Sequence, residues 1–123
     1  MANPNIVNVS SIYGNTSYLI PTGTSATTWT ALTPASGTVN KIDNIVAANV
    51  TGSAATITVA INSAAAGAGT NYRLIYQVIV PVNAALIVVD KSTAFYLGEA
   101  QSIVVTVGTA SAIELTASYE AIT

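Results

Sequence analysis

Few side chains in this sequence are of the types that carry enzyme chemistry. Histidine and cysteine are both absent, which removes the commonest general base, the nitrogen and sulfur metal ligands, and every Ser-His or Cys-His nucleophile. Ser92 directly follows Lys91, but a Ser-Lys dyad needs a buried lysine, and this pair lies in a polar turn signal. We therefore expect Lys91 to be solvated and Ser92 to be unreactive.

The carboxylates are the remaining candidates for catalysis or cation binding. Glu114 and Glu120 alternate with apolar residues near the end of the chain, so we expect both on the polar face of a strand. Asp90 and Glu99 flank residues 91–98 and are expected to shape turns, because calcium takes six or more oxygen ligands. No glycine-rich phosphate loop precedes a helix. The sequence predicts a protein that is not an enzyme, with no cofactor, no metal and no small-molecule ligand.

The charge content restricts the partners. Only 7% of the residues are charged, against about 25% in an average soluble domain. Three cations in a chain of net charge −2 cannot form a nucleic-acid footprint, and polar residues interrupt every apolar run before it could span a membrane. Small neutral surface groups are cheaply covered by another protein, which favours a subunit of an assembly. The alternative is an ordinary secreted or acidophile protein of low charge.

Apolar residues recur with a period of two, which is typical of β-strands, and turn residues separate the runs at short intervals. We expect a single all-β domain, an antiparallel, jelly-roll-like β-sandwich of eight or nine short strands, with a flexible loop at 63–69. The strands are expected near 5–12, 25–33, 38–50, 54–62, 71–80, 84–90, 93–97, 101–107 and 112–120. The side chains expected to face the core are Ile57, Val59, Leu74, Tyr76, Val105, Leu115 and Tyr119.

Residues 1–37 differ from the rest of the chain because they contain no ionised side chain, although valine, isoleucine, tyrosine and tryptophan occur there. Such a segment could be an assembly arm that pairs with a neighbouring subunit, with residues 38–123 as the sandwich core. Alternatively, it closes the sheets of its own domain. The candidate interface residues are Ile6, Val7, Tyr13, Tyr18 and Trp29. The aromatic residues among them could instead stack on sugar rings or fill the core.

About two-thirds of the chain resembles a known group of proteins. The segment Val39–Val59 resembles a pattern in small virion proteins of tailed phages, including those of marine cyanobacteria. Pro81–Val107 is similar to their run of apolar strand, Asp-Lys turn, Tyr-Leu pair, Gly-Glu hairpin and apolar strand. Ser118–Ile122 resembles their Ser-Tyr-Glu-Glu-Ile ending, although Ala121 stands in place of the second glutamate.

This resemblance implies a non-enzymatic β-sandwich built in many copies into a phage particle that assembles in the host cytoplasm. We expect a capsid decoration, or cement, protein that contacts the major capsid protein or another virion protein. The absence of ionised side chains between Met1 and Asn40 predicts self-association through the N-terminal segment, and the resemblance implies that the oligomer is a trimer. A neck, tail or fibre subunit is the alternative within this class, and a carbohydrate-binding module that uses Trp29 and nearby tyrosines is the alternative outside it.

Overall fold

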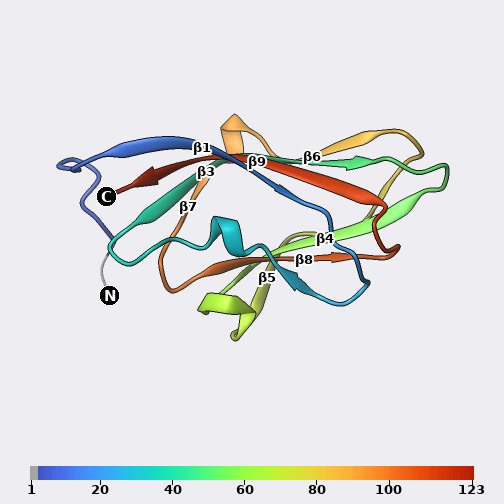
Figure 1. Ribbon diagram of the computed structural model, residues 1–123, viewed down its shortest axis with the longest axis horizontal. Coiled ribbons are helices and arrows are strands. Elements are labelled where there is room, and N and C mark those ends of the chain that lie inside the picture. The colour runs from blue at the N-terminus through green and yellow to red at the C-terminus, as the bar shows by residue number, and fades with distance from the viewer. Residues whose placement is uncertain (1–2) are drawn as a thin grey trace.

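The computed structural model describes residues 3–123. These residues form two packed antiparallel sheets (Figure 1). The first sheet has the order β1-β9-β3-β6, with β7 also paired to β3, and the second has the order β2-β8-β4-β5. The strands are β1 (Ile12–Leu19), β2 (Thr27–Thr28), β3 (Val39–Asn49), β4 (Ala55–Asn62), β5 (Asn71–Val80), β6 (Ala85–Val89), β7 (Phe95–Leu97), β8 (Ser102–Val107) and β9 (Ile113–Ile122).

The strand order is that of a jelly roll. The chain can be traced as a long two-stranded antiparallel ribbon. In this ribbon β4 pairs with β5, β3 with β6, β2 with β8 and β1 with β9. The ribbon is rolled, and its successive strand pairs alternate between the two sheets, as in a double Greek key. The all-β, jelly-roll-like sandwich expected from the sequence is therefore confirmed.

The core lies between the sheets. Of the residues expected to face inward, Ile57, Val59, Val105 and Leu115 are fully buried, and Tyr119 is partly buried against the same cluster. On β9 the neighbours of Leu115 are exposed or partly buried, as alternation requires, whereas β8 is buried on both faces from Ser102 to Val105. Burial of these β-branched and leucine side chains is the main stabilising term of the fold.

The inward direction expected for Leu74 and Tyr76 is wrong. Both are exposed, by 37% and 59%, and Ile75 packs against the core instead. The pairing of β5 with β4 shifts register twice, and Gln77 has a φ of +48°. Each shift inserts an extra residue as a β-bulge, which reverses the faces of the residues beyond it. The alternation read from the sequence therefore does not continue along the whole strand.

The N-terminal strand expected at 5–12 is also displaced. Residues 6–8 form a turn in which the Asn5 side chain accepts a hydrogen bond from the backbone N–H of Val7 (3.0 Å), and β1 begins at Ile12.

The segment 25–33 holds only the two residues of β2 and a short 3-10 turn at Thr30–Leu32. The segment 63–69 contains a single 3-10 turn rather than an α-helix.

Candidate interaction surface

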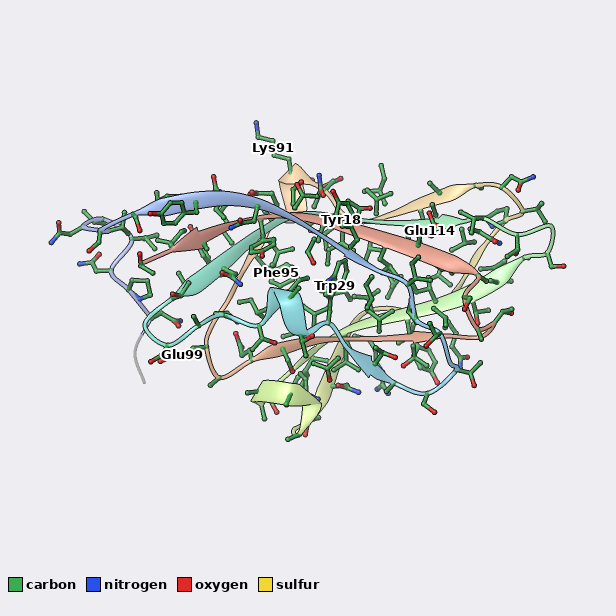
Figure 2. The ribbon with its side chains drawn as sticks, viewed as in Figure 1. Tyr18, Trp29, Lys91, Phe95, Glu99 and Glu114 are labelled. Carbon is green, nitrogen blue, oxygen red and sulfur yellow. The ribbon has the colours of Figure 1, made fainter. Side chains whose placement is uncertain are left out.

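The five candidate interface residues fall into two groups, and Figure 2 labels one residue of each group, Tyr18 and Trp29. Ile6, Val7, Tyr13 and Tyr18 are exposed, with Val7 at 91% and Tyr18 at 74%. Trp29 is only 1% exposed and belongs to the core. Its assignment to an interface is wrong, because a side chain enclosed by its own domain offers no surface to a partner or to a sugar.

Trp29 ties the N-terminal segment to the rest of the domain. Its indole N–H donates a buried hydrogen bond to the Ser17 hydroxyl (3.0 Å), and its backbone N–H donates to the carbonyl of Ile103 (2.8 Å). Leu32, three residues later, is also fully buried. Residues between β1 and Leu32 therefore complete the sandwich of this chain, and only the side chains of this segment that remain exposed can contact a neighbour.

That surface includes the outer edge of β1, the last strand of the first sheet. β1 pairs with β9 from Ile12 to Leu19 without a register shift. Ser11 and Thr123 exchange both of their backbone hydrogen bonds, which makes them a hydrogen-bonded pair. Because such pairs alternate with non-hydrogen-bonded ones along an antiparallel ladder, the residues whose backbone N–H and C=O point away from β9 are Ile12, Gly14, Thr16 and Tyr18. We call this row the β1 edge.

The other sheet edges in residues 3–123 differ from the β1 edge. β2 has two residues, and β6 has five and ends beside the Asp90 turn. β5 has ten residues but is bulged twice and carries Arg73. Short length, bulges and charges are the usual devices that prevent a sheet edge from pairing with another chain. The β1 edge has none of them.

On the outer face of the first sheet, one uncharged row leads inward from Tyr18, whereas the row that begins at Gly14 contains Glu120 and Lys41. The pairing registers align Tyr18, Thr116, Val46 and Ile87 in one row across β1, β9, β3 and β6. Tyr18 and Ile87 are exposed at the two ends of this row, and the residues between them are partly buried. Tyrosine and aliphatic side chains on a flat surface are typical anchors of protein interfaces.

A second exposed group lies on β5 and includes Tyr76, one of the residues that the alternation predicts to face the core. Tyr72, Tyr76 and Ile79 are all more than half exposed. The guanidinium carbon of Arg73 lies 5.2 Å from the ring centroid of Tyr76, a distance at which a cation–π contact forms. The bulge at Gln77, beside Tyr76, leaves no mark in the sequence, because glutamine is not a residue type that signals a positive φ.

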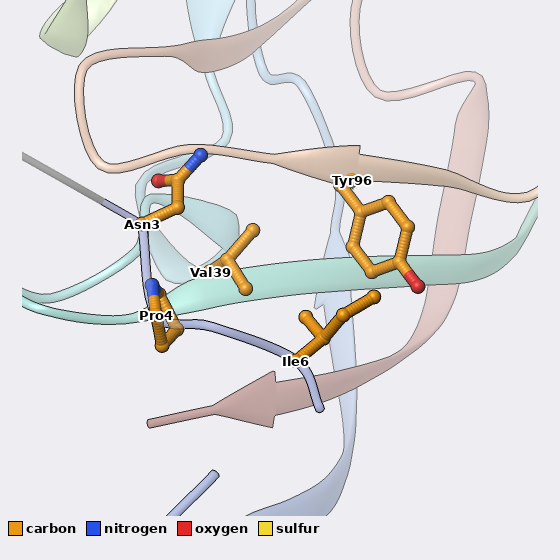
Figure 3. A pocket seen from close by; sticks show the side chains of 5 residues that line it. All are labelled: Asn3, Pro4, Ile6, Val39 and Tyr96. Carbon is orange, nitrogen blue, oxygen red and sulfur yellow. The ribbon is translucent and has the colours of Figure 1, made fainter. Parts of the chain in front are cut away.

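A small pocket lies where the N-terminal segment crosses the start of β3 and β7 (Figure 3). Its volume is about 210 Å³, and it is lined by Asn3, Pro4, Ile6, Val39 and Tyr96. None of these side chains is charged, and pockets for drug-sized ligands are about 300–1,000 Å³. The pocket fits a shallow apolar contact between the N-terminal segment and the sheet better than it fits a ligand site.

The carboxylates shape turns, as expected. Asp90 accepts hydrogen bonds from the Ser92 hydroxyl (2.6 Å) and from the backbone N–H groups of Ser92 (2.9 Å) and Thr93 (3.1 Å). The hydrogen bond from the Ser92 hydroxyl is the largest cause that lowers the pKa of Asp90 below its ordinary value. Glu99 is buried and accepts a hydrogen bond from the backbone N–H of Gly37 (2.8 Å), which joins the turn before β3 to the one after β7.

Two candidates for chemistry named from the sequence can be located among residues 3–123, the Lys91-Ser92 pair and the acidic side chains. Lys91 is exposed and the Ser92 hydroxyl donates to Asp90, so the two do not form a dyad. No group of three or more acidic side chains in the described part of the chain is placed to hold a metal ion. Within the same residues, no helix has the length and apolar character to cross a bilayer.

Comparison of the sequence with protein-family models and with curated proteins gives no match.

Proposed function

We propose that this chain is a structural subunit of a tailed-phage virion, attached in many copies to the outside of the capsid as a decoration protein. The observation that carries the proposal is the β1 edge, an unprotected and uncharged sheet edge with exposed apolar side chains before and along it. The resemblance of Val39–Val59, Pro81–Val107 and Ser118–Ile122 to small virion proteins of tailed phages supplies the class of assembly.

The surface of the chain supports a permanent protein neighbour. Ile6, Val7, Tyr13 and Tyr18 are exposed on a segment without any ionised side chain. A free protein with such an edge is prone to pair with any available strand. A subunit that is always covered by a specific neighbour escapes this hazard, and its small neutral groups lose little hydration on being covered.

The fold is compatible with this role without deciding it. Jelly rolls occur in viral capsid domains and also in lectins, and a fold does not by itself imply a function. For sugar binding, the exposed aromatic residues are Tyr13, Tyr18, Tyr72, Tyr76 and Tyr96, whereas Trp29 is buried. Arg73 already lies over the ring of Tyr76, and this contact competes with a sugar stacked there. We favour the virion subunit because of the resemblance and the β1 edge.

The experiment is mass spectrometry of particles of the phage that encodes the chain, after separation into emptied, tailless heads and isolated tails. A decoration protein is expected in many copies per head, at a constant ratio to the major capsid protein, and absent from tails. Enrichment in the tail fraction would instead identify a neck, tail or fibre subunit. Absence from both fractions, together with specific binding on a glycan array, would support the carbohydrate-binding alternative.

A further inference from the structure

The β1 edge has a backbone pattern that can pair with itself. Its outward N–H and C=O groups belong to Ile12, Gly14, Thr16 and Tyr18, which are alternate residues placed symmetrically about Asn15. In an antiparallel pair of two such edges with a twofold axis at Asn15, Ile12 lies opposite Tyr18 of the other copy and Gly14 lies opposite Thr16. Every outward backbone group of the row then has a hydrogen-bond partner.

Other registers are poorer. Moving the axis to Gly14 leaves Tyr18 without a partner residue of the row, and moving it to Thr16 does the same to Ile12. A shift by a single residue sets outward groups against groups that already bond to β9. The register centred on Asn15 is therefore the one that satisfies the whole edge.

The side chains agree with this register. Ile12 and Tyr18 are on the outer face of the sheet, on the opposite side from the buried Ser17, and are 55% and 74% exposed. The twofold arrangement sets them against each other on both sides of the axis, as pairs of a β-branched and an aromatic side chain, which stabilise antiparallel sheets. The small residues Gly14 and Thr16 meet near the axis, where crowding would be greatest.

We propose that the β1 edge binds the β1 edge of a second copy of this chain, in an antiparallel pair with its twofold axis at Asn15. The two first sheets then form one continuous sheet across the dimer. The occupant is a second copy because Ile12 and Tyr18 complement each other across the axis, and because no ionised side chain between Met1 and Asn40 sets like charges against each other there. Twofold, self-complementary contacts are the commonest in homo-oligomers.

The dimer does not depend on the role in a virion and can be tested on the purified chain. A twofold pairing of β1 with β1 closes after two copies, so a trimer cannot be built from this contact alone. Sedimentation velocity over a concentration series is expected to show a monomer–dimer equilibrium. A monomer at all concentrations, or a trimer as the smallest assembly, would overturn the proposal.

Single cysteines test the register, since the chain has no cysteine of its own. Asn15 lies opposite itself in a non-hydrogen-bonded pair, where Cα atoms are about 4.5 Å apart, which suits a disulfide. Asn15→Cys should therefore form a covalent dimer under mild oxidation. The matched control is Thr16→Cys, whose two copies are diagonal neighbours about 7–8 Å apart, too far to bridge without movement of the backbone. Equal cross-linking of both variants, or of neither, would contradict the register.

A charge exchange at the axis tests whether the partner is a second copy. Asn15→Lys and Asn15→Asp each place two like charges opposite each other, whereas an equimolar mixture can form a mixed dimer with opposite charges. We expect the mixed dimer to be at least about tenfold tighter than either homodimer, from the Coulomb energy of charges about 5 Å apart near a surface. Asn15 is exposed, and unchanged melting temperatures would show that both variants fold. Equal affinities in all three samples would refute the pairing.

Discussion

The hydrogen bond between Trp29 and Ser17 offers a sharp test of how the N-terminal segment belongs to the fold. The indole N–H is buried and has the Ser17 hydroxyl as its acceptor at 3.0 Å. Ser17→Ala removes the acceptor and leaves the donor buried without a partner. The cost of an unsatisfied buried donor is about 1–3 kcal/mol of unfolding free energy, and Ser17 is 8% exposed, so water can restore little of it.

Trp29→Phe supplies the second arm of a double-mutant cycle. Phenylalanine fills part of the same space but has no N–H, so the Ser17→Ala change should cost less in its presence. We expect an interaction energy of about 1 kcal/mol between the two sites, within the range for residues in contact. Ser53→Ala is the control, because Ser53 lies in an exposed turn and its loss should change stability by less than about 0.5 kcal/mol.

The assay is urea unfolding followed by far-ultraviolet circular dichroism, which does not depend on the tryptophan. If Ser17→Ala is no more destabilising than Ser53→Ala, or if the cycle gives no interaction energy, then the bond between Trp29 and β1 does not hold the segment in place. In that case residues before Leu32 would be only loosely attached to the sandwich.

Three further predictions concern stability. Leu115→Ala should cost about 2–5 kcal/mol through lost burial and a cavity, whereas Glu114→Ala, on the exposed face, should cost less than about 0.5 kcal/mol; equal denaturant midpoints would contradict the face assignment. Hydrogen bonds lower the pKa of Asp90 in the folded state below its ordinary 3.8. The ionised Asp90 side chain therefore stabilises the folded state above pH 3.8, and this contribution is lost as the pH falls through the folded-state pKa. Asp90→Ala should therefore be less stable than the native chain at pH 7, and thermal melts should show the difference narrowing below pH 3.8. A shortened chain that begins at Thr38 lacks β1 and Trp29 and should give no cooperative unfolding transition; a cooperative melt would show that the remaining strands fold alone.

The elements that the sequence predicts well are those whose pattern is purely local. β4, β8 and β9 alternate regularly, and their strand limits agree with the expected ones within about two residues. The face assignment of β5 fails because its bulges at Gln77 and between Arg73 and Ile75 arise from pairing with β4, which the order of residues does not encode. The position of β1 is also mispredicted from the sequence. The Gly14-Asn15 dipeptide is typical of a turn, but it adopts an extended conformation in β1 because it pairs with β9.

The candidate surface was predictable only in part. The absence of charge before Lys41 singles out the segment from which the five residues are named, and four of the five are exposed. Composition could not distinguish Trp29, which the fold encloses, from Tyr18, which it leaves outside. Nor could it identify the β1 edge, because the edge position of a strand depends on which strands lack a neighbour in the finished sheet.

The most direct test of the proposed role is electron cryomicroscopy of intact particles with and without the chain, from the phage that encodes it and from a deletion strain. We expect density of this size and jelly-roll shape at many symmetry-related positions on the outer surface of the head, and its loss in the deletion strain. Heads that are identical in the two strains, or extra density confined to the neck, tail or fibres, would contradict a capsid decoration protein.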